Sequence, residues 1–549
     1  MLPKKVSSSF PTIRDITFYL SEQSSDYERA TLSLLQHVDG ASWDSSRACY
    51  AGTRADILDE IMKILTAPAD RSSALRIVLL TGVVGCGKTT IAHSVAKNCA
   101  EDECPMLGSS FFFSCEVDER RRPDKLFSTI SRDLCDHDLA FRKSICDAID
   151  TERALASAPI SRQFDGLILK PAMATSPRRT HPLTIVIDAL DEAYNEDLLG
   201  VLGISAALVP SEFRFFITTR SEATIISRLR DLDHISLKEI NIRDNINRQD
   251  VKVFANNRLT EIANHRQIEN WLDDNLVTRF EHHAEGLFIW AATVFNHVDA
   301  CPGPREELDD ILNNRDLLDS HVTEKMNKLY ANILSKCPWR NPHFTSRYQS
   351  CLGAVIALRR PLSISSIEEL LDDNYAHVAF RPLSSLLTGA LYSDQPVQIA
   401  HSSLRDFVTH CDGGGKYADE RFAISEVHHS QHLALRCIVA LNKGLPALRA
   451  NAAFIFNDER MPSDIPILMD DVHVAEHIWY ACEHWIGHVQ DVKSASDELR
   501  EELAFFMRVC LRIWVAVGAM KGRYFGIRNL YTWSKVMPHF SFDIFISLT

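Results

Sequence analysis

A glycine-rich loop between an apolar segment and a helix-forming segment carries the clearest chemistry in the sequence. The apolar run 77–80 leads into residues 82–89, which read GVVGCGKT, and a helical pattern follows over residues 91–97. This is the G-x-x-x-x-G-K-[ST] pattern in the strand–loop–helix setting that it requires. Glycines let backbone N–H groups turn inward, and the following helix adds its positive end, so the loop suits a triphosphate.

The pattern predicts a role for each loop residue. Lys88 is expected against the β and γ phosphates, and the hydroxyl of Thr89 is expected to bind Mg²⁺. Cys86 is interpreted as a small side chain that the loop tolerates, because no basic partner pattern surrounds it. The predicted phosphate-binding set is Gly82, Val83, Val84, Gly85, Cys86, Gly87, Lys88, Thr89 and Thr90.

A second apolar run, residues 183–187, ends in the acidic sequence Asp188-Ala189-Leu190-Asp191-Glu192. A run of β-branched residues is typical of a parallel strand buried on both faces, and such strands present ligand-binding groups at their carboxyl ends. We therefore expect Asp188 to hold Mg²⁺, directly or through water. Either Asp191 or Glu192 would orient and activate the water that attacks the γ phosphate. The alternative is an ordinary buried strand that ends in a solvated acidic turn.

Composition narrows the class of protein. The chain has 549 residues, of which 46% are apolar and 24% charged, and a net charge of −14. These values are typical of soluble globular protein with three or four domains, and the acidic charge argues against nucleic-acid and membrane partners. A motor acting on nucleic acid is disfavoured for the same reason. Fourteen cysteines without a C-x-x-C pair, and the lack of an export segment, favour reduced thiols and a cytoplasmic location.

Alternating patterns predict an α/β sheet followed by helical parts. Strands are expected at 109–114, 184–188, 213–219 and 235–240, among helices such as 55–65, 125–135 and 141–149, which implies a parallel sheet covered on both faces. Helical patterns continue over 250–262, 271–297 and 321–334. Two β-like pieces at 389–392 and 397–400, near helices at 348–359 and 365–371, suggest a winged-helix domain. Later helices are expected at 426–442, 473–489 and 496–518.

These patterns predict five parts: a short helical lead (1–48), an NTPase core (49–241), a helical lid (242–340), a winged-helix domain (341–411) and a C-terminal helical domain (412–549). Histidine pairs such as His484 and His488 could share a helix face. Without paired cysteines or an H-E-x-x-H order, structural roles are favoured for them over metal binding.

Further short motifs occur in a consistent order along residues 40–535. They are Cys49 with Gly52-Thr53-Arg54, Gln163-Phe164, Ile217-Thr218-Thr219-Arg220, the stretch 284–291 around Gly286-Leu287-Phe288, Leu329-Tyr330, the stretch 401–407 and the stretch 480–485. Together with the loop and the acidic motif, they resemble the NACHT proteins of the STAND class of P-loop NTPases, in particular those expanded in fungi.

The resemblance implies further site residues. The strand 217–220 would lie between the loop strand and the acidic strand, which would bring Arg220 near the γ phosphate as a sensor; an arginine that ends a strand in solvent is the alternative. Thr53 and Arg54 would run past the adenine, although a turn before a helix explains them equally well. His401 would contact the β phosphate of a bound diphosphate from the winged helix, or would simply be packed at a strand end.

The sequence departs from the family in two respects. Ala189 stands where glycine is usual, which we expect only to narrow the turn. No repeat array follows the helical region and nothing like an effector domain precedes residue 40, so protein partners are expected to act through missing or separate sensor and effector parts.

The resemblance therefore predicts a signalling switch that binds ATP, or GTP, with Mg²⁺ and hydrolyses it slowly, with nucleotide-dependent homo-oligomerisation and a role in self/non-self recognition. The alternative is a truncated interaction scaffold that binds nucleotide without significant turnover.

Overall fold

The computed structural model describes residues 27–68, 75–101, 106–175, 182–314, 322–410, 419–451 and 473–520. The chain divides into two compact units: residues 1–261 with 272–288, and residues 262–271 with 289–549. The predicted boundary at 411/412 and most of the predicted N-terminal lead lie outside the described residues.

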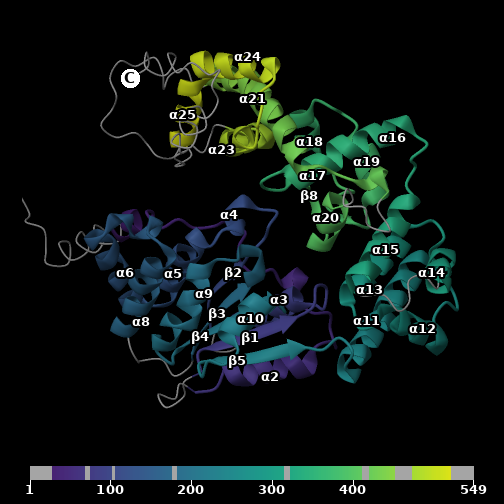
Figure 1. The fold of residues 1–549 in the computed structure, drawn as a ribbon, viewed down its shortest axis with the longest axis horizontal. Helices are drawn as coiled ribbons and strands as arrows, with labels where there is room; N and C mark the ends of the chain where they lie inside the picture. Colours follow the sequence, from purple (N-terminus) through teal and green to yellow (C-terminus); the bar gives the residue numbers. More distant parts are fainter. Residues whose placement is uncertain are drawn as a thin grey trace, which may run out of the picture. The chain divides into compact units, whose positions relative to one another are not determined.

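A five-stranded parallel sheet forms the centre of the first unit (Figure 1). Its strand order is β2-β3-β4-β1-β5, so β4 pairs with both β1 and β3. The expected parallel sheet is confirmed, and so is the position of the strand that carries residues 217–220. The strands are β1 (Ile77–Gly82), β2 (Leu107–Phe112), β3 (Leu183–Asp188), β4 (Phe213–Arg220) and β5 (Ile235–Ile240).

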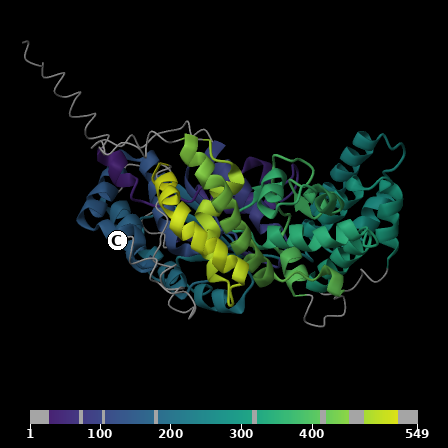
Figure 2. The same cartoon turned by 90° about the horizontal axis from the view of Figure 1, so that it is seen from above.

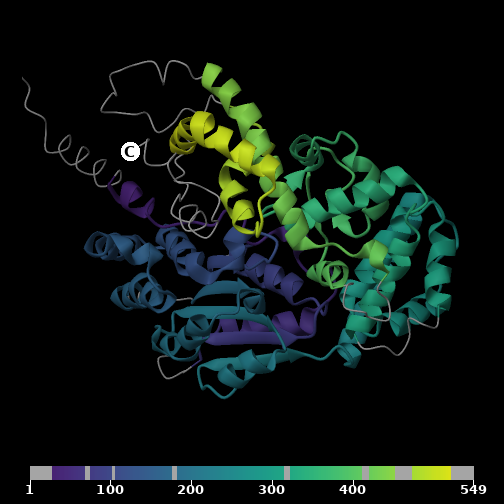
Figure 3. The same cartoon turned by 45° about the horizontal axis from the view of Figure 1, so that its top comes forward.

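The two faces of this sheet have different cores because alternate residues of a strand point to opposite sides. Val186 and Phe216 pack with α2 and α3 on one face, and Ile187 and Ile217 pack with helices including α5 and α6 on the other. Figure 3 shows the sheet with its covering helices. Helices of this unit are α2 (Ala55–Leu65), α3 (Lys88–Glu101), α4 (Asp118–Arg121), α5 (Leu126–His137), α6 (Leu139–Thr151), α7 (Ile160–Gln163), α8 (Lys170–Ala174), α9 (Glu196–Gly203), α10 (Ala223–Leu229) and α12 (Asp274–Ala284).

The prediction for the helical region that follows the sheet was wrong in one respect. The region 271–297, expected to be helical throughout, contains α12 and α13 (Phe288–Ala300), because Glu285 and Gly286 are both left-handed with φ of 49° and 79°. A Cβ on Gly286 would lie 2.0 Å from the carbonyl oxygen of Ile242. Asn247 of α11 (Asn245–Arg266) donates to the carbonyls of both Ile242 and Gly286, at 2.8 and 2.9 Å. The turn is therefore fixed against the chain that leaves the sheet.

The second unit contains a small antiparallel sheet of order β6-β8-β7, made by β6 (Leu362–Ser363), β7 (Leu387–Thr388) and β8 (Pro396–Ile399). The expected hairpin exists, but its first strand lies earlier than predicted. Residues 389–392 form its turn, because Gly389 has φ of 73° and a Cβ there would lie 2.1 Å from the Pro396 carbonyl oxygen. The assignment as a winged helix stays a prediction.

The other elements in the described part of the second unit are helices, and the last of them pack side by side (Figure 2). π-Helical turns at Tyr348–Leu352 and Phe506–Cys510 interrupt stretches that were expected to be regular α-helix. Among the described residues, none of the helices is long and apolar enough to cross a membrane. The helices are α14 (Pro304–Asn313), α15 (Val322–Ser335), α16 (Pro342–Arg347), α17 (Gly353–Ala357), α18 (Ile364–Leu371), α19 (Ala376–Phe380), α20 (Ser402–Thr409), α21 (Glu426–Asn451), α23 (Glu476–Gln490), α24 (Asp497–Phe505) and α25 (Leu511–Met520).

A buried hydrogen-bond network around His488 joins α21 and α23. Ser430 Oγ donates to Asp491 at 2.7 Å, so it accepts at 2.9 Å from His488 Nδ1, which must carry the ring proton. His488 Nε2 then accepts from the Tyr480 hydroxyl at 2.7 Å, and that hydroxyl accepts from the backbone N–H of Arg359 at 3.0 Å. The network satisfies a neutral imidazole at both ring nitrogens. The expectation of a structural role is therefore confirmed for His488.

The stability of the second unit should fall in acid because of this network. Burial holds the pKa of His488 well below its ordinary value, and the charges of Arg359 and His484 add to the effect. Below about pH 6.5 the imidazole of His488 binds a proton in the unfolded chain but not in the native state. The free energy of unfolding therefore decreases as the pH falls. We expect His488→Gln to reduce this dependence by up to about 1.4 kcal/mol per pH unit in urea unfolding monitored across pH.

The exposed His473 offers a matched control, since it lies before α23 and outside the network. His473→Gln should keep the wild-type pH dependence. An unaltered pH dependence in His488→Gln would contradict the assignment of a buried neutral imidazole.

Candidate functional site

The glycine loop lies between the tip of β1 and the start of α3, and its own side chains hold its carbonyl groups. Lys88 Nζ donates to the carbonyl oxygens of Gly82 and Val83, at 2.8 and 3.0 Å. Thr90 Oγ1 donates to the Gly87 carbonyl at 2.7 Å. Gly85 and Gly87 have φ of 77° and 95°, which L-residues with side chains rarely adopt. The loop therefore has the curled backbone that its sequence predicts.

Cys86 points into the protein rather than towards a ligand. Its side chain is fully buried, and burial raises the pKa of its thiol. A Cβ on Gly82 would lie 2.8 Å from Cys86 Sγ, so the two residues pack closely. Cys86 therefore fills space beneath the loop as a small buried side chain, and its predicted place in the phosphate-binding set stays a prediction.

Asp188 ends β3 as a buried carboxylate on the face of the sheet that α3 covers. It follows Val186 by two residues, and Val186 packs on that same face. Burial raises the pKa of Asp188, while the Thr218 and Thr89 hydroxyls and the Lys88 ammonium oppose the shift. Lys88 and Thr89 at the start of α3 therefore lie within interaction range of Asp188, although β4 separates the strands β1 and β3 that position them.

Thr218 of β4 holds Asp188 in place. Its hydroxyl donates to Asp188 Oδ1 at 2.5 Å and accepts from the backbone N–H of Ala189 at 3.0 Å. The sequence motif around Arg220 contained this threonine, but the prediction gave it no role. In the register of β3 and β4, Ile187 lies opposite Ile217, so Thr218 and Asp188 follow on the same face of the sheet. The alternation of side chains along the strand was the signal that could have revealed the role of Thr218.

Ala189 does more than narrow the turn after β3. It is left-handed, with φ of 58° and ψ of 49°, a conformation that costs a residue with a side chain about 1 kcal/mol or more. This explains why glycine suits the position. The turn brings Asp191 and Glu192 to the same edge as Asp188.

Asp191 is paired with Arg220. The backbone N–H of Arg220 donates to Asp191 Oδ1 at 2.9 Å, and its Nε lies 2.9 Å from Asp191 Oδ2. The Asp191 side chain is 5% exposed and that of Arg220 is 31% exposed. Arg220 therefore ends its strand bound to a carboxylate instead of pointing freely into solvent.

Glu192 is in a different environment from Asp191. Its Oε2 accepts from the backbone N–H of Cys115 at 2.8 Å. Burial raises the pKa of Glu192, and the negative charges of Asp191 and Asp188 add to this, against the Cys115 hydrogen bond and Arg220. A carboxylate with a raised pKa is suited to accept a proton.

The segment before α2 lies against the back of the loop. Thr53 is buried and its hydroxyl donates to the Tyr50 carbonyl at 2.7 Å. Arg54 is 5% exposed, and its Nη2 donates to the Cys86 carbonyl. Their predicted contact with adenine stays a prediction. His401, in the second unit, is the N-cap of α20 and accepts from the Ser403 backbone N–H at 3.1 Å. Its predicted phosphate contact also stays a prediction.

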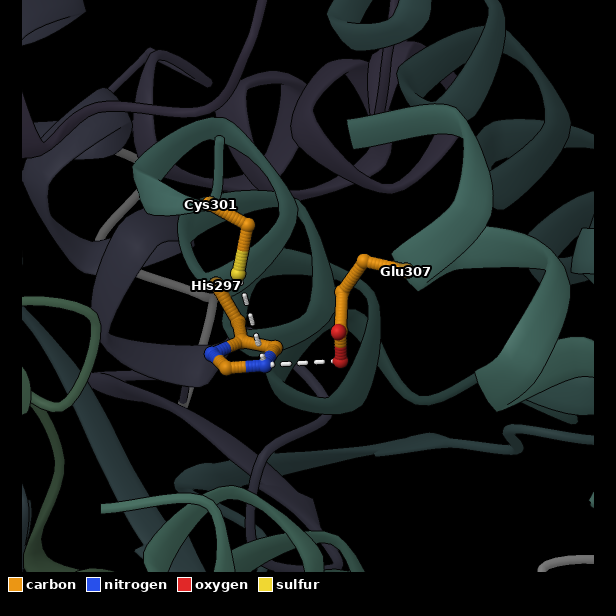
Figure 4. A group of neighbouring side chains, drawn as sticks. All are labelled: His297, Cys301 and Glu307. Atoms are coloured by element: carbon orange, nitrogen blue, oxygen red, sulfur yellow. Dashed lines mark hydrogen bonds and ion pairs between the residues drawn. The ribbon is translucent and has the colours of Figure 1, made fainter. Parts of the chain in front are cut away.

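A separate cluster in the second unit has the residue types of a metal site (Figure 4). His297 Nε2 lies 3.0 Å from Glu307 Oε1 and 3.9 Å from Cys301 Sγ. The same Glu307 oxygen binds the ammonium of Lys336, and Lys336 and His297 lower the pKa of Glu307 although burial opposes this. The carboxylate charge is thus already balanced, so we interpret the cluster as an ion-pair network between α13 and α14.

A parallel sheet of this order, with a glycine loop at the tip of β1 and a carboxylate at the tip of β3, fits an α/β P-loop NTPase core. The family model described as "Nephrocystin 3, N-terminal" matches residues 52–220. The match runs from Gly52 to Arg220, and so it includes both the glycine loop and the acidic motif. Fold, site and family match together support nucleotide binding of the ATPase kind.

Other comparisons add little. No curated protein matches the chain. The structure of C. elegans PCH-2 matches at 13% identity and a TM-score of 0.29, covering 48% of this chain and 69% of that one. The Aeropyrum pernix ORC2 protein, in ADPNP–ADP complexes, matches at 13% identity and a TM-score of 0.31, covering 68% and 95%. TM-scores this low set no constraint on this chain.

Two neighbouring threonines of β4 allow a matched test of how Asp188 is held. Thr218→Val removes the hydroxyl between Asp188 and Ala189 and leaves both groups buried without it, so the free energy of unfolding should fall by about 1–3 kcal/mol. Thr219 is also fully buried, but its hydroxyl has no hydrogen-bond partner in the described structure. Thr219→Val should therefore be neutral or stabilising in urea unfolding. Equal losses from the two substitutions would contradict the role given to Thr218.

Proposed function

We propose that this protein is a nucleotide-dependent switch that binds ATP, or GTP, at the β1–α3 loop and hydrolyses it slowly. The observation that carries the proposal is the convergence of Lys88, Thr89 and Asp188 at the tips of two strands that flank β4. A cation and inward-facing backbone N–H groups on one tip, with a carboxylate on the other, suit a polyphosphate and its metal ion.

The donor set fits Mg²⁺, because a hydroxyl and a buried carboxylate are hard oxygen ligands within range of each other. Thr89 and Asp188 would hold the ion, which when bound would neutralise charge on the phosphates. Lys88 would exchange the carbonyls of Gly82 and Val83 for phosphate oxygens. Thr218 would keep the Asp188 carboxylate fixed throughout.

Between the two candidate bases, the contacts favour Glu192. Asp191 already accepts a hydrogen bond from the Arg220 backbone N–H and forms an ion pair with its guanidinium, whereas Glu192 has a raised pKa and one backbone donor. In this proposal Glu192 orients the attacking water and accepts its proton, and Asp191 keeps Arg220 at the strand tip. Arg220 would then be in reach of the γ phosphate as a sensor.

The resemblance to STAND-class NACHT proteins extends the proposal to signalling. Bound diphosphate would hold the core, the helical lid and a winged-helix domain closed, with His401 on the β phosphate, and exchange for triphosphate would open them. A difference of a few kcal/mol in binding free energy between the two states suffices for such a switch. Protein partners, nucleotide-dependent self-association, a cytoplasmic location and a role in self/non-self recognition belong to the same proposal.

Nucleotide affinity tests the site directly. Lys88→Ala should weaken binding of MgATP at least about tenfold in calorimetry, because it removes a charged donor to phosphate. Lys97→Ala is the matched control, since Lys97 lies on the same helix and pairs with Glu101. Wild-type affinity in Lys88→Ala would refute the proposed site.

Turnover tests the assignment of the base. Glu192→Gln should retain MgATP affinity and lose phosphate release by about 100-fold or more, because it removes the proton acceptor. Glu196→Gln, at a carboxylate that pairs with Arg228 near the same edge, should behave like wild type. If the wild-type protein holds nucleotide but releases no phosphate, and Glu192→Gln is indistinguishable from it, the scaffold alternative is favoured.

A further inference from the structure

Arg54 is enclosed by three parts of the first unit that are far apart in the sequence. Its Nη2 donates to the Cys86 carbonyl in the glycine loop, its Nη1 lies 3.9 Å from Asp250 Oδ2 on α11, and its guanidinium carbon lies 4.6 Å from the centre of the Phe288 ring. A buried guanidinium is costly unless it is paired on several sides. These contacts therefore constrain one another.

The contact with Cys86 bears on the phosphate-binding face of the loop. The carbonyl of Cys86 and the N–H of Gly87 belong to one planar trans peptide, so they point in opposite directions. A carbonyl held on Arg54, at the back of the loop, turns the Gly87 N–H away from Arg54. Because Gly85 and Gly87 are both left-handed glycines, this peptide has little steric restraint of its own. A fixed donor behind the loop supplies that restraint.

The other contacts link Arg54 to the helices that follow the sheet. Asp250 is half-buried, and the Arg54 backbone N–H and guanidinium oppose the effect of burial on its pKa. Phe288 follows the Gly286 turn, which Asn247 fixes to the chain leaving β5. The Phe288 ring also packs on Phe254 of α11, with centroids 5.6 Å apart. A shift of the Arg54 guanidinium must therefore disturb α11 and the turn before α13.

We propose that Arg54 is a positioning residue of the nucleotide site: it orients the Cys86–Gly87 peptide towards the phosphates and couples occupancy of the loop to α11 and the Gly286–Phe288 turn. The inference rests on the proposed nucleotide binding. It assigns Arg54 to the phosphate end of the site, in place of the adenine contact that the sequence resemblance implies.

Two ligands separate these roles. If Arg54 orients the loop, its substitution changes the affinity for any polyphosphate. If Arg54 contacts the base, its substitution changes the affinity for nucleotides alone. We therefore expect Arg54→Gln to weaken binding of both MgADP and magnesium tripolyphosphate by about tenfold or more in calorimetry, as loss of a charged hydrogen bond predicts. Arg54→Lys should recover only part of the affinity, because one ammonium cannot serve three partners. Arg243→Gln, at an exposed arginine after β5, should bind both ligands like wild type.

Hydrogen exchange tests the coupling. In wild type, saturating MgADP should slow exchange in α11 and in residues 284–288. Arg54→Gln, saturated with the same ligand, should lack this slowing. Phe288→Leu keeps the cation and its carboxylate but removes the ring, so it should bind MgADP nearly like wild type and lose the slowing in residues 284–288. This variant, with Arg54→Lys, decides the question if Arg54→Gln does not fold.

The outcomes separate the two proposals. A wild-type protein that binds neither MgADP nor MgATP overturns the proposed function. A wild-type protein that binds, with Arg54 variants that keep its affinity and its exchange response, overturns only the positioning role. Loss of MgADP affinity with unchanged tripolyphosphate affinity also overturns it and restores the contact with adenine.

Discussion

The site depends on one buried carboxylate. Asp188 is 2% exposed, and a carboxylate at that depth is stable only when nearby donors compensate for lost water. The sheet order supplies them: with β4 between β1 and β3, Thr218 reaches Asp188 from one side while Lys88 and Thr89 lie within range at the start of α3. A different strand order would leave the same residues unable to meet. The order of the strands is thus an electrostatic requirement as much as a topological one.

Much of this arrangement could be predicted because it depends on residues that are contiguous in the sequence. The loop and the acidic motif are each a strand followed by a turn, and local sequence determines both. The position of β4 between them came from resemblance, since a pattern of alternating strands and helices does not define which strands pair. What could not be predicted involves pairs distant in sequence, such as Arg54 with Asp250 and Phe288. The break at Gly286 was missed for a related reason: helical periodicity continues on both sides, and the turn exists because Asn247 and Ile242 fit against it.

Three turns of the first unit contain a non-glycine residue with a left-handed backbone conformation. Arg54, Ala189 and Glu285 are non-glycine residues with positive φ, a conformation that costs energy and persists only where its surroundings enforce it. Each lies at a turn that determines where a following side chain is placed. Ala189 directs Asp191 and Glu192 to the strand edge, Arg54 itself reaches the loop, and Glu285 precedes the turn that places Phe288.

The loop can accept an anion because cations already hold its carbonyl groups. Lys88 binds those of Gly82 and Val83 from within the loop, and Arg54 binds that of Cys86 from behind it. Each peptide whose carbonyl is fixed in this way has its N–H directed to the other side, so the cations orient the amide dipoles as well as adding charge. In the proposed site the two differ in one respect: Lys88 would exchange its carbonyl partners for phosphate oxygens, whereas Arg54, which is buried, would keep the Cys86 carbonyl. On this proposal the first cation responds to the ligand, and the second preserves the loop conformation that binds it.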